Sequence, residues 1–216
     1  MKPSPPTRNS SPIKGLYIIT DARFGLGHIE MAERVLRAGV RIIQFREKDL
    51  CRKEMFETVL MLRNVSRIYK AILIINDHVD IAAAVDADGV HLGQDDLSID
   101  VSRRILGSDK IIGISTHNLA EALEAQRAGA DYIGLGAMFP SDTKKEAKVC
   151  GIEMLRTIRP HITIPIVAIG GITPENVTEI VKAGADAVAV ASAVSLPKNS
   201  LENTIHIFME AFSTPR

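Results

Sequence analysis

Eight short runs of β-branched and other apolar residues alternate along the chain with longer segments of helical periodicity. The runs are residues 16–20, 40–45, 72–75, 89–91, 111–114, 132–135, 165–169 and 187–190. Runs of this kind indicate buried strands, and the segments between them, such as 52–69, 118–128 and 174–182, are long enough for crossover helices. The alternation predicts an α/β fold with a parallel sheet.

Two folds can hold eight such units: a closed (β/α)8 TIM barrel and a doubly wound open sheet. A length of 216 residues suits the small end of the barrel range. A weak repeat supports the count, because Ala-Gly closes a helix and opens a strand at 38–39, 128–129 and 183–184. The open sheet is the second choice, since no G-x-G-x-x-G follows the first strand. We expect a single-domain barrel over residues 15–216, preceded by a flexible Pro- and Ser-rich tail over residues 1–14.

Charge and cysteine content narrow the class of partner. Lys plus Arg and Asp plus Glu both total 26, so the net charge of zero gives no case for nucleic acid or a membrane surface. No window approaches the roughly 20 apolar residues of a membrane helix. Cys51 and Cys150 lack partners at metal-ligand spacing, and the N-terminus has no apolar signal segment. We expect a cytoplasmic protein with reduced cysteines and small-molecule substrates. The sequence allows a homo-oligomer and does not decide the oligomeric state.

Gln44, Arg46 and Lys48, called here the clamp, occupy alternate positions at the end of the second strand. On an extended chain their side chains point the same way, so an amide and two cations face one ligand. The carboxyl ends of strands are where α/β folds keep their chemistry, which favours an anion site. The alternative is that Arg46 and Lys48 are solvated charges paired with Glu47 and Asp49.

Carboxylates follow the next two strands. Asn76 and Asp77 end the third strand, and Asp95 and Asp96 come shortly after the fourth. Hard oxygen ligands of this kind suit Mg²⁺, which takes one or two protein carboxylates and lets substrate phosphates supply others. With the clamp, this pattern indicates a diphosphate site. The alternative for Asn76 and Asp77 is that they cap the following helix.

Further polar residues follow the later strands. Ser115 ends the fifth strand, where it could also be a helix cap. The loop 137–151 holds hydroxyls and lysines, as expected of a lid over an anion, although a solvated loop has the same composition. The Gly pair 170–171, and Ala191 with Ser192, stand where many barrels bind phosphate through backbone N–H groups. A tight turn would equally require glycine.

Taken together, these residues resemble the thiamine-phosphate synthase family, also called thiamine-phosphate pyrophosphorylase. The resemblance covers about residues 15–195 and rests on segments 44–48, 75–77, 88–96, 113–115, 131–136, 141–145 and 169–172. It implies a (β/α)8 transferase of thiamine biosynthesis that uses Mg²⁺. Such an enzyme joins 4-amino-5-hydroxymethyl-2-methylpyrimidine diphosphate to 4-methyl-5-(2-phosphoethyl)thiazole, or its carboxylate, releasing diphosphate and forming thiamine phosphate.

The resemblance also implies roles on the pyrimidine side of the site. The clamp matches residues that bind the pyrimidine and its diphosphate, and Asn76 matches a diphosphate contact. Asp77 and Asp96 match the Mg²⁺ ligands, Asp96 being preferred as the second acidic residue after Gln94. Ser115 matches a serine near the reacting pyrimidine, and Lys144 a lysine on the leaving group. The residues expected in catalysis are Arg46, Lys48, Ser115 and Lys144.

On the thiazole side, the resemblance implies contacts to the phosphate or carboxylate. The matching residues are Ser141, Thr143, Gly171, Ala191 and Ser192. The family usually has Thr where Ser141 stands, and the hydroxyl is kept.

The implied chemistry is ionisation of the diphosphate and trapping of a pyrimidine cation by the thiazole nitrogen, which needs charge and position more than acid or base. Two rival functions stay open at this point. One is an isomerase, tautomerase-like or acting on sugar phosphates, that uses only the phosphate site of the last two strands. The other is a non-catalytic phosphate-binding barrel.

Overall fold

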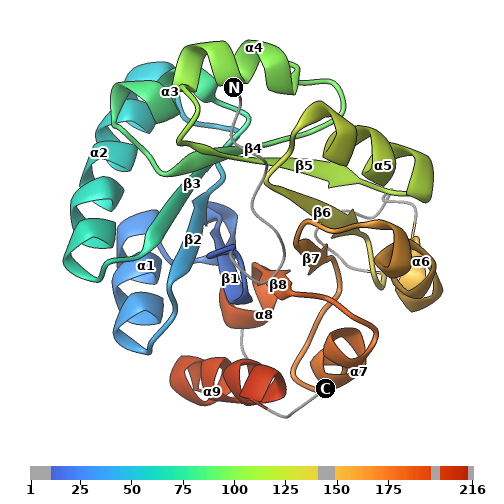
Figure 1. Ribbon diagram of the computed structural model, residues 1–216. Coiled ribbons are helices and arrows are strands. Elements are labelled where there is room, and N and C mark those ends of the chain that lie inside the picture. The colour runs from blue at the N-terminus through green and yellow to red at the C-terminus, as the bar shows by residue number, and fades with distance from the viewer. Residues whose placement is uncertain (1–10, 141–148, 196–199, 214–216) are drawn as a thin grey trace.

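Eight parallel strands close into a barrel in the part of the chain that the structure, a computed structural model, describes: residues 11–140, 149–195 and 200–213. Each strand pairs with the next, and the last pairs with the first (Figure 1). The strands are β1 (Gly15–Thr20), β2 (Ile42–Phe45), β3 (Ile72–Asn76), β4 (Gly89–Leu92), β5 (Ile111–Thr116), β6 (Tyr132–Gly136), β7 (Ile166–Ile169) and β8 (Ala187–Val190). The predicted (β/α)8 barrel is confirmed, and the open sheet is excluded because β8 pairs with β1.

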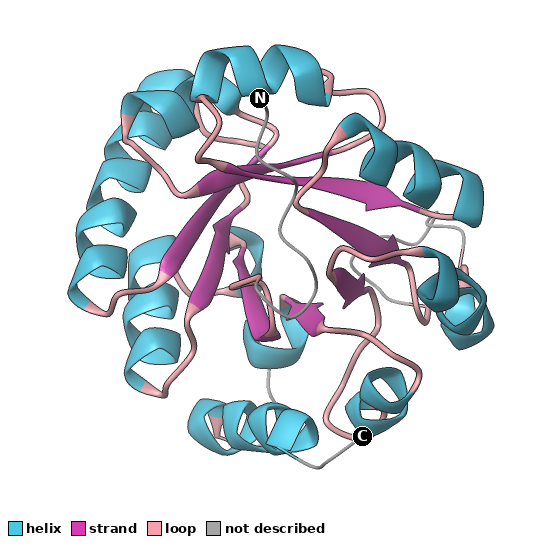
Figure 2. Cartoon of the chain, viewed as in Figure 1, coloured by secondary structure: helices cyan, strands magenta, loops and turns pink. Residues whose placement is uncertain are grey.

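Helices alternate with the strands and ring the barrel (Figure 2). They are α1 (His28–Arg37), α2 (Arg52–Ile68), α3 (Val79–Ala84), α4 (Ile99–Leu106), α5 (Leu119–Ala128), α6 (Gly151–Ile158), α7 (Val177–Lys182), α8 (Ser192–Ser195) and α9 (Leu201–Ser213). Their ends follow local chemistry: the Asn118 side chain accepts a hydrogen bond from the Glu121 backbone N–H and caps α5, and Gly129 ends it with φ +90°. None of the helices described here is long and apolar enough to cross a membrane.

Side chains alternate between two apolar layers. On β1, Leu16 and Ile18 face outward and pack under the helices, whereas Tyr17 and Ile19 face the barrel interior. The interior cluster consists of Ile13, Tyr17, Ile19, Ile42, Ile74, Tyr132, Val167, Ala187 and Ala189. Full burial of a large apolar side chain stabilises the fold by roughly 1.5–3 kcal/mol. The barrel is therefore a packed core with its chemistry confined to the ends of the strands.

Aspartates that precede three strands tie those strands to their neighbours. Each carboxylate accepts a hydrogen bond from a backbone N–H of the neighbouring strand and pairs with an arginine, at 2.7–2.9 Å. The sets are Asp88 with Leu73 and Arg63, Asp131 with Ile112 and Arg103, and Asp186 with Ile166 and Arg159. These ion pairs lie at the N-terminal ends of the strands, the end of a barrel that serves stability.

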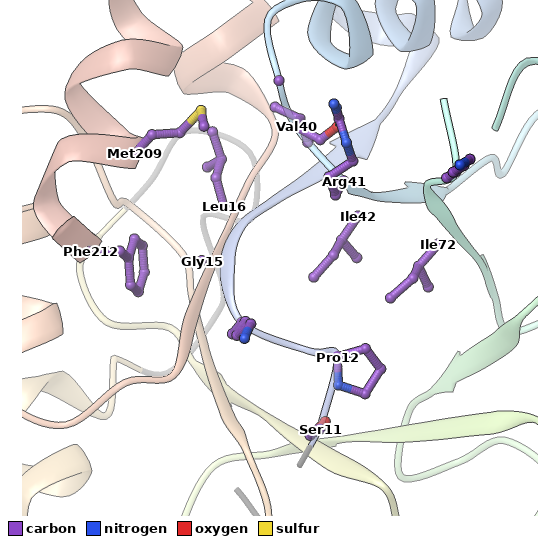
Figure 3. Close-up of a pocket in the computed structure, with 13 residues that line it drawn as sticks. Ser11, Pro12, Gly15, Leu16, Val40, Arg41, Ile42, Ile72, Met209 and Phe212 are labelled. Atoms are coloured by element: carbon purple, nitrogen blue, oxygen red, sulfur yellow. The ribbon is translucent and has the colours of Figure 1, made fainter. Parts of the chain in front are cut away.

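The chain packs against the barrel before β1 begins. Ile13 is 1% exposed and belongs to the interior cluster, and its backbone N–H donates to the Ser11 hydroxyl at 3.2 Å. The expected tail of residues 1–14 therefore includes packed residues from Ser11 on, and residues 1–10 lie outside the described part. A pocket of about 700 Å³ lies beside this segment, lined by residues such as Arg41 and Phe212 (Figure 3). It borders the N-terminal ends of β1–β3, away from the residues predicted to carry chemistry.

Candidate active site

The carboxyl ends of the strands bring the predicted residues to one rim of the barrel. Gln44 lies within β2, Asn76 ends β3 and Ser115 lies in β5. The other described candidates stand in the segments just after strands; they are Arg46 and Lys48 after β2, Asp77 after β3, Asp96 after β4, Gly171 after β7, and Ala191 with Ser192 after β8. Three candidates, Ser141, Thr143 and Lys144, lie outside the described residues.

Arg46 points toward the end of β1. Its Nη1 donates to Asp21 Oδ2 at 2.8 Å, and Arg23 binds the same carboxylate. Burial alone would raise the pKa of Asp21, but hydrogen bonds from Arg23 and the charges of Arg23 and Arg46 lower it overall. The structure thus pairs Arg46 with Asp21 and not with Glu47 or Asp49, the alternative partners. Asp21 holds the guanidinium at the rim and was missed by sequence reasoning.

The Glu47 side chain points toward His28 and holds the backbone at Lys48, the last residue of the clamp. Its Oε2 lies 3.0 Å from His28 Nε2, and its Oε1 accepts hydrogen bonds from the backbone N–H groups of Lys48 and Asp49. His28 in turn contacts the Thr20 hydroxyl at 2.8 Å. The pKa of Glu47 lies below its ordinary value. Burial alone would raise this pKa, but the hydrogen bonds from Asp49, His28 and Lys48 outweigh that effect. With Glu47 held beneath, the exposed Lys48 side chain is left available at the rim.

Asp77 and Asp96 bring two carboxyl groups together. Asp77 adopts a left-handed backbone (φ +64°), and its N–H donates to the His91 carbonyl at 2.9 Å. Asp96 Oδ2 accepts the Gly93 backbone N–H at 2.6 Å. Burial, followed by the charge of Asp96 and a hydrogen bond with it, raises the pKa of Asp77 to about 6, against the opposing charges of Lys48 and Arg46.

This carboxyl pair fits a divalent cation. Two hard oxygen donors that repel one another as anions are stabilised by a shared positive ion, and Mg²⁺ commonly takes only one or two protein carboxylates. In the described residues, His, Cys, Asp and Glu form no cluster of three or more that could hold a metal by itself. The donor set therefore suits an ion whose remaining ligands are water and substrate oxygens.

A chain of hydrogen bonds crosses the barrel interior from Gln44 to Ser115. Gln44 Nε2 donates to the Tyr17 hydroxyl at 2.8 Å, which lies 3.0 Å from the Tyr132 hydroxyl. The Tyr132 hydroxyl lies 2.9 Å from His91 Nδ1, and His91 Nε2 lies 2.8 Å from Ser115 Oγ. Sequence reasoning found both ends of this chain and missed the three residues between them.

Two glycines make room for the side chains of Tyr132 and His91. A Cβ on Gly113 of β5 would lie 2.0 Å from Tyr132 Cζ, and a Cβ on Gly134 of β6 would lie 2.9 Å from His91 Cε1. Glycine inside a strand marks close approach of another group, so these positions were the available signal. Burial lowers the pKa of His91 to about 4, with the charge of Asp96 opposing this shift, so the imidazole is neutral at physiological pH.

The glycine pair after β7 forms a tight turn against the segment after β6. Gly170 and Gly171 both have positive φ, +96° and +65°. A Cβ on Gly171 would lie 2.7 Å from Phe139 Cβ and from the Pro140 carbonyl. The turn interpretation is therefore sufficient for glycine here, and a phosphate contact by Gly171 stays a prediction.

The loop expected to act as a lid is tied down at both ends. The N–H groups of Met138 and Phe139 donate to the carbonyls of Ile169 and Gly170, at 2.9 and 3.0 Å. Cys150 N–H donates to the Ala137 carbonyl at 2.9 Å. Residues 141–148, between these anchors, lie outside the described part of the chain.

Comparison with known proteins gives a consistent result. The family described as Thiamine monophosphate synthase matches residues 16–194. Thiamine-phosphate synthase of Chloroflexus aurantiacus is 48% identical over 182 residues, covering 83% of this chain and 84% of the relative. Thiamine-phosphate synthase of Persephonella marina is 44% identical over 202 residues, covering 92% and 97%. The solved structure of thiamine phosphate pyrophosphorylase from Pyrococcus furiosus is similar with a TM-score of 0.85 and 41% identity, covering 92% of this chain and 95% of that one.

Proposed function

The chain belongs to the thiamine monophosphate synthase family, and from this membership we propose that its barrel rim couples a pyrimidine diphosphate to a thiazole phosphate. The activity is that of a transferase of thiamine biosynthesis, with thiamine phosphate and diphosphate as products. The observation that carries the assignment of the site is the pairing of Asp77 and Asp96 beside Arg46 and Lys48. Two carboxylates and two cations at one rim suit a magnesium diphosphate.

In this proposal each rim residue binds a particular group of one of the two substrates. Arg46, Lys48 and Asn76 bind the diphosphate, and Asp77 with Asp96 would hold Mg²⁺. Gln44 and Ser115 contact the pyrimidine. Lys144 contacts the leaving group, while the thiazole phosphate or carboxylate meets Ser141, Thr143, Gly171, Ala191 and Ser192.

Catalysis in this scheme is electrostatic and positional. Bound Mg²⁺ would neutralise charge on the leaving diphosphate. Arg46 and Lys48 add fixed positive charge at the same oxygens, so the bond to the pyrimidine methylene carbon can ionise. The thiazole nitrogen then attacks the cation, and a closed loop over the site would exclude water that competes for it.

A product assay tests the function directly. Purified protein with both substrates and Mg²⁺ is expected to release thiamine phosphate and diphosphate in equal amounts. A chelator is expected to stop product formation and added Mg²⁺ to restore it. Absence of product under every metal condition would exclude the synthase activity. Unchanged product formation in the presence of the chelator would exclude a requirement for Mg²⁺.

Lys144→Ala tests the lid residue. Its charge is placed on the leaving group, so we expect kcat to fall by roughly 10²-fold while KM for the thiazole phosphate changes little. Lys145→Ala is the matched control, since it removes a neighbouring lysine with no assigned role. Equal changes in kcat and thiazole KM would contradict the role.

We also propose a reducing, cytoplasmic setting for this enzyme. Cys51 and Cys150 are free thiols in the structure, and nothing in the proposed chemistry needs them oxidised.

A further inference from the structure

We propose that Tyr17, Tyr132 and His91 form a one-directional hydrogen-bond relay that fixes His91 as its Nε2–H tautomer and aims the Ser115 hydroxyl hydrogen at the substrate. The relay begins at the Gln44 amide and ends at Ser115. It rests on the proposed function only in taking Ser115 as a substrate contact. The three relay residues are positioning residues in this scheme. The inference names the substrate atom facing Ser115 as a hydrogen-bond acceptor, a ring nitrogen of the pyrimidine.

The direction is set at the Gln44 end. The amide Nε2 can only donate, so the Tyr17 oxygen accepts from it, at 2.8 Å. Tyr17 then has its own hydrogen for Tyr132, 3.0 Å away. Tyr132 passes its hydrogen to His91 Nδ1, at 2.9 Å. A neutral imidazole that accepts at Nδ1 carries its hydrogen on Nε2, and it donates this hydrogen to Ser115 Oγ at 2.8 Å.

The barrel interior favours an unbroken relay. Tyr17 and Tyr132 lie in the interior apolar cluster, at 1% and 0% exposure, so water cannot easily satisfy their hydroxyls. Burial raises the pKa of both phenols, which keeps them protonated and able to donate. The Tyr132 ring stacks on His91 with centroids 5.5 Å apart, and Gly113 opens the space that the ring fills.

The relay determines what Ser115 can do. One lone pair of its oxygen receives the His91 hydrogen, so its own hydrogen is available for an acceptor across the rim. The Ser115 carbonyl is separately bound by the Gln94 amide at 2.6 Å, which holds the backbone in place.

The first experiment reads the tautomer itself in substrate-free protein. Long-range proton–nitrogen NMR on histidine-labelled protein is expected to show His91 with a bare Nδ1 and a protonated Nε2. In Tyr132→Phe the donor to Nδ1 is lost, and we expect a mixture of the two tautomers. A protonated Nδ1 in the unsubstituted protein would reverse the relay and overturn the proposal. The tautomer is read without turnover, so this experiment tests the relay even if the product assay shows no synthase activity.

The second experiment separates positioning from folding. Tyr132→Phe is expected to lower kcat about tenfold, with KM for the pyrimidine diphosphate changing less than threefold, because one aligned hydrogen bond is lost. Tyr69→Phe is the matched control: it removes a phenol oxygen from the end of α2, outside the barrel interior, and is expected to leave kcat unchanged. Equal kcat values for the two variants would overturn the relay. Tyr17→Phe removes the hydroxyl that donates to Tyr132 and so breaks the relay one step earlier. If Tyr132→Phe does not fold, the kcat of Tyr17→Phe is compared with that of Tyr69→Phe, and equal values would again overturn the relay.

Discussion

Replacing Asp77 with asparagine is expected to lower turnover by roughly 10²–10³-fold, since it removes a carboxylate from the proposed metal pair and its charge from the rim. The same change is expected to raise the free energy of unfolding of the metal-free protein near neutral pH. Burial and the charge of Asp96 hold the pKa of Asp77 at about 6, above its ordinary value of 3.8. The ionised group is therefore less favourable in the folded chain than in the unfolded one.

The sign of the pH dependence follows from this shift. Between pH 3.8 and about 6 the folded protein binds more protons at Asp77 than the unfolded chain does. Its stability therefore falls as the pH rises through that window, and the loss is complete above it. Two pKa units correspond to about 3 kcal/mol at most, and screening of a half-buried group reduces the expected gain in Asp77→Asn to about 1 kcal/mol.

The measurements are steady-state turnover and urea unfolding without metal, at pH values below and above this window. Asp95→Asn is the matched control, because Asp95 is an exposed neighbour with no part in the carboxyl pair. We expect Mg²⁺ to stabilise the unsubstituted protein and this control, and to leave Asp77→Asn unchanged. Full turnover in Asp77→Asn would contradict the metal-binding role proposed for Asp77.

Gly113→Ala is expected to destabilise the protein by about 2 kcal/mol and to lower activity with it. The added methyl would lie 2.0 Å from Tyr132 Cζ, so the ring must move or the strand must shift. The ring stands in a packed interior and contacts both Tyr17 and His91, so its displacement also breaks the hydrogen bonds that lead to Ser115.

Urea unfolding measures the first effect and kcat the second. Gly27→Ala is the control, because a Cβ there has no heavy atom within 4 Å and the residue is exposed. We expect Gly27→Ala to change stability by less than about 0.5 kcal/mol. A Gly113→Ala protein as stable as this control would mean that the interior is looser than the packing of Tyr132 indicates.

The strands were predictable because a parallel barrel buries both faces of its sheet and leaves short apolar runs in the sequence. The predicted run 40–45 began two residues early. Val40 instead lies in the turn that follows α1, since its N–H donates to the Val35 carbonyl at 3.1 Å after Gly39 takes a φ of +103°. The rim residues were predictable for the same reason as the strands: residues just after each strand must meet at one end.

The partners of the rim residues were not predictable, because barrel closure brings together residues far apart in sequence. Tyr17 and Tyr132 are 115 positions apart, and their hydroxyl contact depends on the curvature of the whole sheet. The Arg46–Asp21 pair joins two neighbouring strand ends, and local charge pattern pointed instead to Glu47 and Asp49. Sequence alone indicates which residues reach the rim and leaves their pairing to the fold.

The anchored loop after β6 has a consequence for how such a site can diversify. Its two ends are tied to β7 and to each other by the hydrogen bonds of Met138, Phe139 and Cys150. Lengthening a loop whose ends are fixed costs little, about 0.6 kcal/mol for each doubling. The anchors at residues 137–139 and 150 therefore let the length of chain between them differ among related enzymes, while β6 and β7 keep their register.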